Sequence, residues 1–187
     1  MAFLCLTPNS SVAQTDIQNR VTFWGGYSFN SIPFLGKTRN SETQIFAIGY
    51  QQKVRSYPNN RSLWYTADIV PYLHFYYPKR DEENRMVNRT GFGLAPVGFT
   101  VLQRTESFLH PFIQTTGGFI YMESNFPTDQ ARRFNFTFDV TLGANIPISH
   151  FAGISLGYKF HHISNAETGK ENPGLDSNFL FLTLSIH

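Results

Sequence analysis

The chain has 187 residues and a mass of 21.4 kDa, which suits one domain, because two halves would each approach the lower size limit for an independent core. Its 15 Lys and Arg against 13 Asp and Glu give a formal net charge of +2, so the charge indicates no nucleic acid partner. With 19 Phe, 9 Tyr, 14 Gly and 10 Pro, the composition excludes a disordered polymer, disfavours a helical bundle and favours an all-β fold.

The first 13 residues resemble the end of a signal peptide. A short apolar stretch is followed by small and polar residues ending in Ser11-Val12-Ala13, which is similar to a signal-peptidase site. The basic start is absent and the apolar core is short, so we interpret residues 1–13 as a signal-peptide remnant, truncated or read from a late start codon. A disordered tail is the alternative. Residues 14–187 then form the single domain, and the lone Cys5 permits no intrachain disulfide or cysteine metal site.

From residue 20 onward the hydrophobic pattern has a period of two, which is the period of a β-strand. The clearest case begins at Phe134, where every second residue is apolar and the residues between, beginning with Asn135, are polar or small. Pro71 and Pro111 fall within two such segments and each removes a ladder donor, so we expect β-bulges there. The pattern predicts eight strands, near 20–29, 43–54, 63–77, 90–101, 108–121, 133–146, 152–164 and 177–187.

The breaks between these segments alternate in length. Those at 102–107 and 147–151 are short and the one at 55–62 is intermediate, whereas the others are longer and polar. No apolar run reaches the ~18 residues of a membrane-spanning helix, and the mean hydropathy is -0.24. Two architectures remain: a soluble lipocalin-like barrel with its apolar face inward, or a transmembrane barrel with that face outward. The signal-like start and the aromatic residues near the segment ends favour an eight-stranded antiparallel transmembrane β-barrel.

One constellation in the seventh segment carries chemistry. On a strand, His162 and Ser164 project from the same face, where a general base can meet a hydroxyl. His161 and Lys159 point the other way, so the two histidines cannot share a metal, and we expect neither metal nor cofactor. If the 165–175 loop closes symmetrically, Asp176 pairs opposite Ser164 and its carboxylate lies diagonal to His162.

Other polar residues surround this pair. Glu167 and Glu171 are rival carboxylates inside the loop, and Asn165 and Asn172 offer donors for an oxyanion. From spacing alone, a polar cap where the strand leaves the membrane explains the pair better, because a His-x-Ser sequence is common on strands. The G-x-S-x-G match around Ser155 is rejected as a nucleophile elbow, because it lies within an alternating strand with no following helix.

Residues 158–180 resemble the lipid A 3-O-deacylase (PagL) family of Gram-negative outer membranes. The resemblance is carried by His162-Ile163-Ser164-Asn165 and Asn172-Pro173-Gly174. It implies a Ser164 nucleophile, a His162 base and an acid at Asp176, with Asn165 and Asn172 in binding or oxyanion stabilisation. Where the family pattern has a glutamate, this chain has Asp176, one methylene shorter. We expect the role to survive if the strands sit slightly closer.

The family further implies that the substrate is lipid A of lipopolysaccharide, cleaved at the ester-linked 3-hydroxyacyl chain at its 3 position. The expected location is the outer membrane among its lipids, with the site facing the outer leaflet and no nucleic acid partner; a homodimer is left open. Outer-membrane phospholipase A also has a His-x-Ser-Asn arrangement, but with an amide as third residue, calcium and twelve strands. That esterase and a non-catalytic small barrel are the alternatives.

Overall fold

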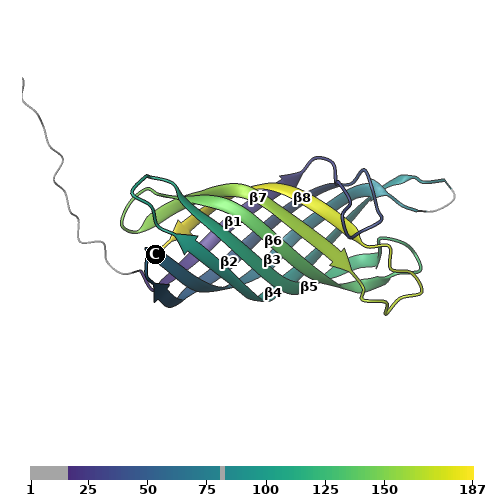
Figure 1. The fold of residues 1–187 in the computed structure, drawn as a ribbon. Coiled ribbons are helices and arrows are strands. Elements are labelled where there is room, and N and C mark those ends of the chain that lie inside the picture. The colour runs from purple at the N-terminus through teal and green to yellow at the C-terminus, as the bar shows by residue number, and fades with distance from the viewer. Residues whose placement is uncertain (1–16, 81–82) are drawn as a thin grey trace, which may run out of the picture.

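A computed structural model describes residues 17–80 and 83–187, which form one closed antiparallel barrel (Figure 1). Each strand pairs with the next, and the last closes onto the first, so the all-β prediction and its eight segments are confirmed. The proposed signal-peptide remnant, residues 1–13, lies outside the described residues. The strands are β1 (Asn19–Ser28), β2 (Glu42–Tyr57), β3 (Arg61–Pro78), β4 (Met86–Gln103), β5 (His110–Phe126), β6 (Arg132–Pro147), β7 (Ala152–Ser164) and β8 (Leu175–Ile186).

Several strands run further than the alternating pattern indicated. The β3–β4 ladder continues to the pair Pro78–Met86, and the predicted break at 55–62 shrinks to a turn at 58–60 with positive φ at Asn59 and Asn60. This short turn and the connections 104–109 and 148–151 lie at the end of the barrel where the C-terminus lies (Figure 1). The connections 29–41, 127–131 and 165–174, with residues 79–80 and 83–85, lie at the other end, which we call the loop end.

The two faces of the wall decide what kind of barrel this is. On β6 the aromatic positions Phe136 and Phe138 are 45% and 46% exposed, whereas Thr137 and Asp139, which alternate with them, are buried in the lumen. A soluble barrel would bury the aromatic face. Because the apolar face points outward here, the fold is a transmembrane barrel whose lipid-facing residues alternate with polar interior ones.

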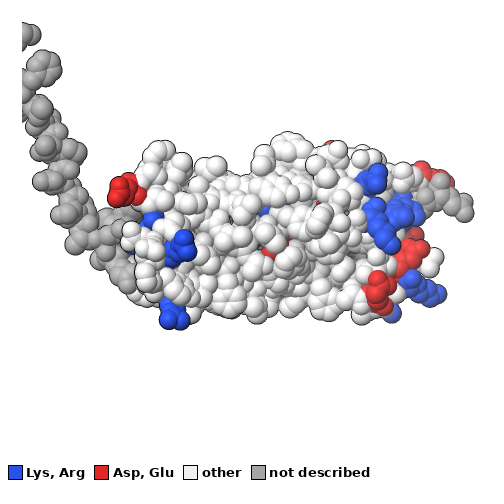
Figure 2. Space-filling model, viewed as in Figure 1, with Lys and Arg blue, Asp and Glu red and all other residues white. Residues whose placement is uncertain are grey.

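Charge follows the same division. On the face drawn in Figure 2, Lys, Arg, Asp and Glu gather near the two ends, and the band between them is nearly free of surface charge. Uncharged side chains are what the hydrocarbon region of a bilayer requires of the surface that meets it. Among residues 17–80 and 83–187, no helix is long and apolar enough to cross a membrane.

The proline predictions have different outcomes. At Pro71 the register shifts on both sides of β3, so the bulge is confirmed. The bulge expected at Pro111 is wrong, because Pro111 pairs regularly with Ala144 on β6. On the side of β5 that faces β4, the ladder ends at the pair Leu102–Phe112. Pro111 lies beyond this last pair, so its missing backbone N–H breaks no ladder hydrogen bond.

The lumen at the loop end is filled by an apolar core. Phe75, Phe126 and Phe179 are fully buried in it, and Ile163 at the end of β7 and Leu175 at the start of β8 belong to the same cluster. These two inward side chains fix the backbone of both strands at the point where they leave the ladder. Their neighbours on the outward face are therefore held in register with one another.

Candidate active site

The ends of β7 and β8 bring the sequence-predicted polar residues to the outer face of the wall. His162 pairs with Phe138 on β6 and directly with Asp176 on β8, and Ser164 ends β7 opposite Phe136. Strand alternation explains why these residues face outward, because Ile163 between them is buried in the core. The site thus opens on the lipid-facing side near the loop end.

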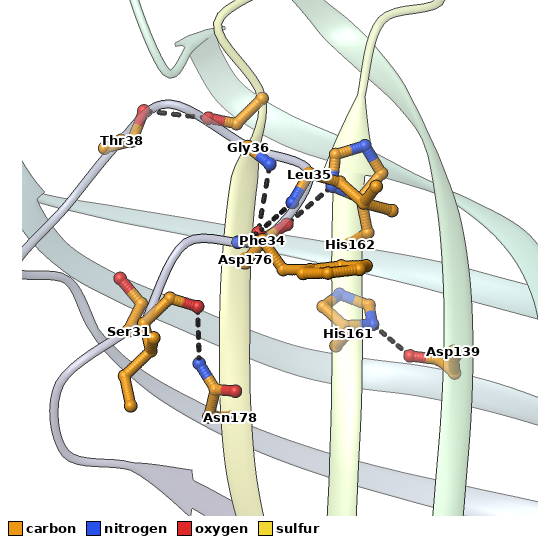
Figure 3. Close-up of polar contacts among 12 residues, drawn as sticks. Ser31, Phe34, Leu35, Gly36, Thr38, Asp139, His161, His162, Asp176 and Asn178 are labelled. Atoms are coloured by element: carbon orange, nitrogen blue, oxygen red, sulfur yellow. Dashed lines mark hydrogen bonds and ion pairs between the residues drawn. The ribbon is translucent and has the colours of Figure 1, made fainter.

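His162 and Asp176 make a close contact. His162 Nδ1 lies 2.6 Å from Asp176 Oδ1 (Figure 3). An ionised carboxylate only accepts hydrogen bonds, so the imidazole donates through Nδ1 and its Nε2 keeps a free lone pair. That is the tautomer that a general base needs.

The register between the two strands differs from the symmetric closure expected from sequence. Asp176 lies opposite His162 rather than opposite Ser164, a slip of two residues that keeps every side chain on its predicted face. The reason lies in the loop, where Gly174 has φ +62° and the Lys170 and Glu171 amides donate to the Gln130 carbonyl. Because of this register, the short aspartate side chain reaches the imidazole directly.

Asp176 is fully buried although it points outward, because the 29–41 loop covers it. The backbone N–H groups of Phe34, Leu35 and Gly36 donate to Oδ2 over 2.5, 2.8 and 2.9 Å (Figure 3). Together with the imidazole, these donors satisfy the carboxylate in its ionised form. The sequence did not predict this contribution of the loop, because almost every residue has a backbone N–H and no residue type marks the ones that bind the carboxylate.

The Ser164 hydroxyl has no hydrogen-bond partner among the described residues. It is partly exposed and shares the outward face with the imidazole two residues earlier, as the spacing predicted. Beside it, a Cβ on Gly174 would lie 3.1 Å from His162 Cε1, so the missing side chain at 174 leaves room for the ring. The hydroxyl is therefore free to accept a new partner next to the imidazole.

The loop after β7 is held by its own amides. Asn165 is buried, and its Nδ2 donates to the Glu171 carbonyl over 2.6 Å, while its backbone N–H donates to Asn172 Oδ1 over 2.9 Å. Asn172 Nδ2 donates to the Glu167 carboxylate over 3.1 Å. Both asparagines thus adjoin the site, whereas the rival carboxylate of Glu167 is engaged within the loop and the Glu171 side chain is exposed.

A second His–Asp pair lies one residue away but inside the barrel. His161 Nδ1 contacts Asp139 Oδ1 (Figure 3). Thr116 Oγ1 donates to Asp139 Oδ2 over 2.5 Å. His161 and Asp139 are buried in the lumen, as the alternation of β7 predicts for His161. Ser155 also faces the interior, where it accepts from Asn145 Nδ2, so its rejection as an elbow nucleophile agrees with its position.

The side chains near the site also decide whether it could hold a metal or cofactor. Within residues 17–80 and 83–187, no group of three or more His, Cys, Asp or Glu side chains is placed to hold a metal ion. The polar groups at the lipid-facing site are one imidazole, one carboxylate, one hydroxyl and two amides. Such a set can perform acyl transfer by a serine nucleophile.

The fold and this set of groups define the class as an eight-stranded outer-membrane-type barrel with an outward-facing polar site. The family model described as lipid A 3-O-deacylase (PagL) matches residues 44–185, which is most of the chain and all of β7 and β8 except the last residue of β8. The chain belongs to the lipid A 3-O-deacylase family. No curated protein sequence matches the chain.

Two solved structures share the fold. The crystal structure of the outer membrane enzyme PagL superimposes with a TM-score of 0.58 at 18% identity, covering 88% of this chain and 97% of that one. The crystal structure of Neisserial surface protein A gives a TM-score of 0.52 at 12% identity, covering 90% and 96%. At these identities the likeness concerns the barrel, and the family assignment rests on the sequence match.

Proposed function

We propose that this chain is an outer-membrane lipid A 3-O-deacylase, which hydrolyses the ester-linked 3-hydroxyacyl chain at the 3 position of lipid A in lipopolysaccharide. The observation that carries the proposal is the His162–Asp176 hydrogen bond, which lies on the lipid-facing wall inside the family match. A base on that surface is useful for a substrate that itself resides in the bilayer.

In the proposed first step, Ser164 Oγ attacks the ester carbonyl carbon while His162 Nε2 accepts the hydroxyl proton. Asp176 stabilises the imidazolium through Nδ1. The tetrahedral intermediate collapses, the sugar oxygen leaves with the proton from Nε2, and an acyl-serine ester remains. Catalytic hydrogen bonds often close only when substrate is bound, which accounts for the unengaged Ser164 hydroxyl.

In the second step, water attacks the acyl-serine carbonyl and gives a proton to His162 Nε2. Collapse of the second tetrahedral intermediate returns that proton to Ser164 Oγ and releases a 3-hydroxy fatty acid. No metal or cofactor takes part in either step of this proposal.

The oxyanion donors are proposed to come from the 165–174 loop. Asn172 Nδ2 is bonded to the exposed Glu167 carboxylate and can exchange that partner for a developing oxyanion. Asn165 Nδ2 donates to the Glu171 carbonyl, so we assign Asn165 a structural role in holding the loop beside Ser164.

Aromatic side chains around the site would receive the acyl chain. Phe136 and Phe138 on β6 stand directly beside Ser164 and His162, and Phe34 from the 29–41 loop packs edge-on against Phe160 with ring centroids 6.0 Å apart. All four lie on the outward side of the barrel. An acyl chain can therefore approach from the bilayer without entering the lumen.

The proposed orientation follows from strand direction. If the N-terminal end of β1 is periplasmic, the odd-numbered strands run outward and the end of β7 lies at the outer leaflet. Lipopolysaccharide resides in that leaflet. The outer membrane is accordingly the proposed location, with the site facing its outer leaflet.

The test is mass spectrometry of lipid A from Gram-negative cells that express the chain with a complete signal peptide. The wild-type chain should remove one 3-hydroxyacyl mass, and Ser164→Ala should remove none. Ser155→Ala is the matched control, because it changes a serine of the same strand that faces the lumen. It should retain the activity.

Folded barrel must be present in every sample, as judged by its heat-modifiable electrophoretic mobility. If the Ser164→Ala variant still deacylates lipid A, the serine mechanism is refuted. If the folded wild-type chain leaves lipid A unchanged but releases fatty acids from phospholipids, the protein is an esterase of the phospholipase A type instead.

A further inference from the structure

We propose that the Phe34–Gly36 segment of the 29–41 loop is a positioning element of the catalytic site, acting through the Asp176 carboxylate. This inference rests on the proposed function, since it assigns a role within the same reaction. It concerns backbone amides that the family motifs around His162 and Ser164 do not include. The segment lies more than a hundred residues away from those motifs in the sequence.

The loop is attached to the start of β8 by several contacts. Lys37 N–H donates to the Pro173 carbonyl over 2.6 Å, and Thr38 Oγ1 donates to the Gly174 carbonyl over 2.8 Å. Thr38 also forms an isolated parallel bridge with Leu175. The loop is thus docked on the outer side of the wall immediately beside the catalytic strands.

The two oxygens of Asp176 have separate partners. Oδ2 accepts the three loop amides, and Oδ1 faces His162 Nδ1 (Figure 3). A carboxylate free on one side could rotate about its Cβ–Cγ bond, but three convergent donors hold Oδ2 in place. Successive N–H groups that converge on an anion in this way form a concave binding site for it. The loop therefore fixes where Oδ1 points, and Oδ1 fixes the imidazole.

The close approach of the loop depends on Gly36. A Cβ at this position would lie 2.9 Å from Leu175 N and 3.0 Å from Gly174 C, both of them backbone atoms that cannot move aside cheaply. Gly36→Ala should lift the loop by roughly the size of this overlap. A catalytic group displaced by about 1 Å can cost 10²-fold in rate. We expect Gly36→Ala to lower kcat by roughly 10- to 100-fold, with a smaller rise in KM because Phe34 of the same loop also moves.

The decisive readout is non-additivity. If the loop acts through Asp176, Gly36→Ala should change the residual rate by less than about twofold in an Asp176→Ala background, because residues acting as one unit are not additive. Gly117→Ala is the matched control, since its new Cβ would meet nothing closer than 4.0 Å. Thr38→Val removes the hydroxyl anchor at nearly constant shape and should give a smaller loss of kcat than Gly36→Ala.

Two results would overturn the proposal. One is a folded Gly36→Ala barrel with kcat within twofold of wild type. The other is an equal loss caused by Gly36→Ala in the wild-type and Asp176→Ala backgrounds, which would indicate general damage or direct contact with substrate.

Amide hydrogen exchange tests the positioning contact without measuring activity. Failure of this contact can therefore be distinguished from failure of the proposed function. The Phe34, Leu35 and Gly36 amides should be protected in the folded wild-type barrel and should lose protection in Asp176→Ala. If the wild-type chain deacylates nothing yet shows this pattern, the lipid A proposal fails while the positioning contact stands. Rapid exchange of these amides in the wild-type barrel would refute the contact itself.

Discussion

Replacing Asp176 by Asn tests the catalytic assignment most directly, because the structure dictates how the new amide must orient. Three backbone N–H groups converge on Oδ2, so only the amide oxygen can occupy that place. The amide NH₂ group must then face His162 Nδ1. An NH₂ donor requires Nδ1 to be the acceptor, which moves the ring proton to Nε2. The imidazole would be held in the tautomer that cannot take a proton from Ser164.

The expected loss follows from that tautomer. In a serine triad with intact geometry, an acid-to-amide change of this kind lowers kcat by about 10⁴-fold. That factor corresponds to about 5.5 kcal/mol of transition-state stabilisation. In the proposed mechanism, substrate binds through the outward aromatic side chains rather than through the acid, so KM should change little.

The assay is release of 3-hydroxy fatty acid from lipid A by the refolded barrel in detergent micelles at neutral pH. The matched control is Asp139→Asn, which makes the same change in the interior His161 pair. It should leave the rate within about twofold. It should also lower the free energy of unfolding by roughly 1.5–3 kcal/mol, the usual range for a hydrogen bond to a charged group. An Asp176→Asn barrel that keeps more than a tenth of the wild-type rate would refute Asp176 as the catalytic acid. Glu167 and Glu171 would then be the next candidates for that role.

Two further predictions follow from the geometry of the wall. Gly174→Ala places a side chain at φ +62° and 3.1 Å from His162 Cε1, so the rate of fatty acid release should fall roughly tenfold. Thermal denaturation should show a loss of about 1–2 kcal/mol, and a variant with unchanged rate and stability would contradict this account of the turn. Leu142→Arg puts a charge on the lipid-facing side of β6 and should lower insertion stability by about 2–4 kcal/mol if this residue lies at the bilayer midplane. Folding into lipid vesicles measures that effect, and Thr141→Val on the lumen side is the comparison.

The eight strands and their faces could be predicted because alternation records directly which side of a wall a residue occupies. On β6, the alternation predicted from Phe134 to Leu142 is confirmed, with the apolar side facing outward as the favoured transmembrane barrel requires. Periodicity alone cannot distinguish inside from outside. The strand ends were less predictable, since the β3–β4 ladder continues to Pro78 and Met86, beyond the alternating segments that sequence analysis identified.

The site was predictable to the extent that it depends on strand spacing. His162 and Ser164 share a face because they are two residues apart, and Asp176 was placed on the correct face of β8. The register was wrong by two residues, because it depends on a positive φ at Gly174 and on contacts with Gln130, neither of which periodicity encodes. The catalytic roles of these residues stay predictions until the variants are measured.

The two neighbouring His–Asp pairs show why the covering loop matters for the site. Asp139 faces the lumen, where Thr116 and His161 supply its donors from adjacent strands. Asp176 faces the lipid side, where the neighbouring strands supply no donor besides His162. A carboxylate left unsatisfied there would be strongly destabilising. At the loop end the long connection 29–41 folds back over the wall and supplies the other donors. The covered acid therefore lies near the ends of β7 and β8. In the proposed function, this is where the acyl ester near a lipid headgroup would lie.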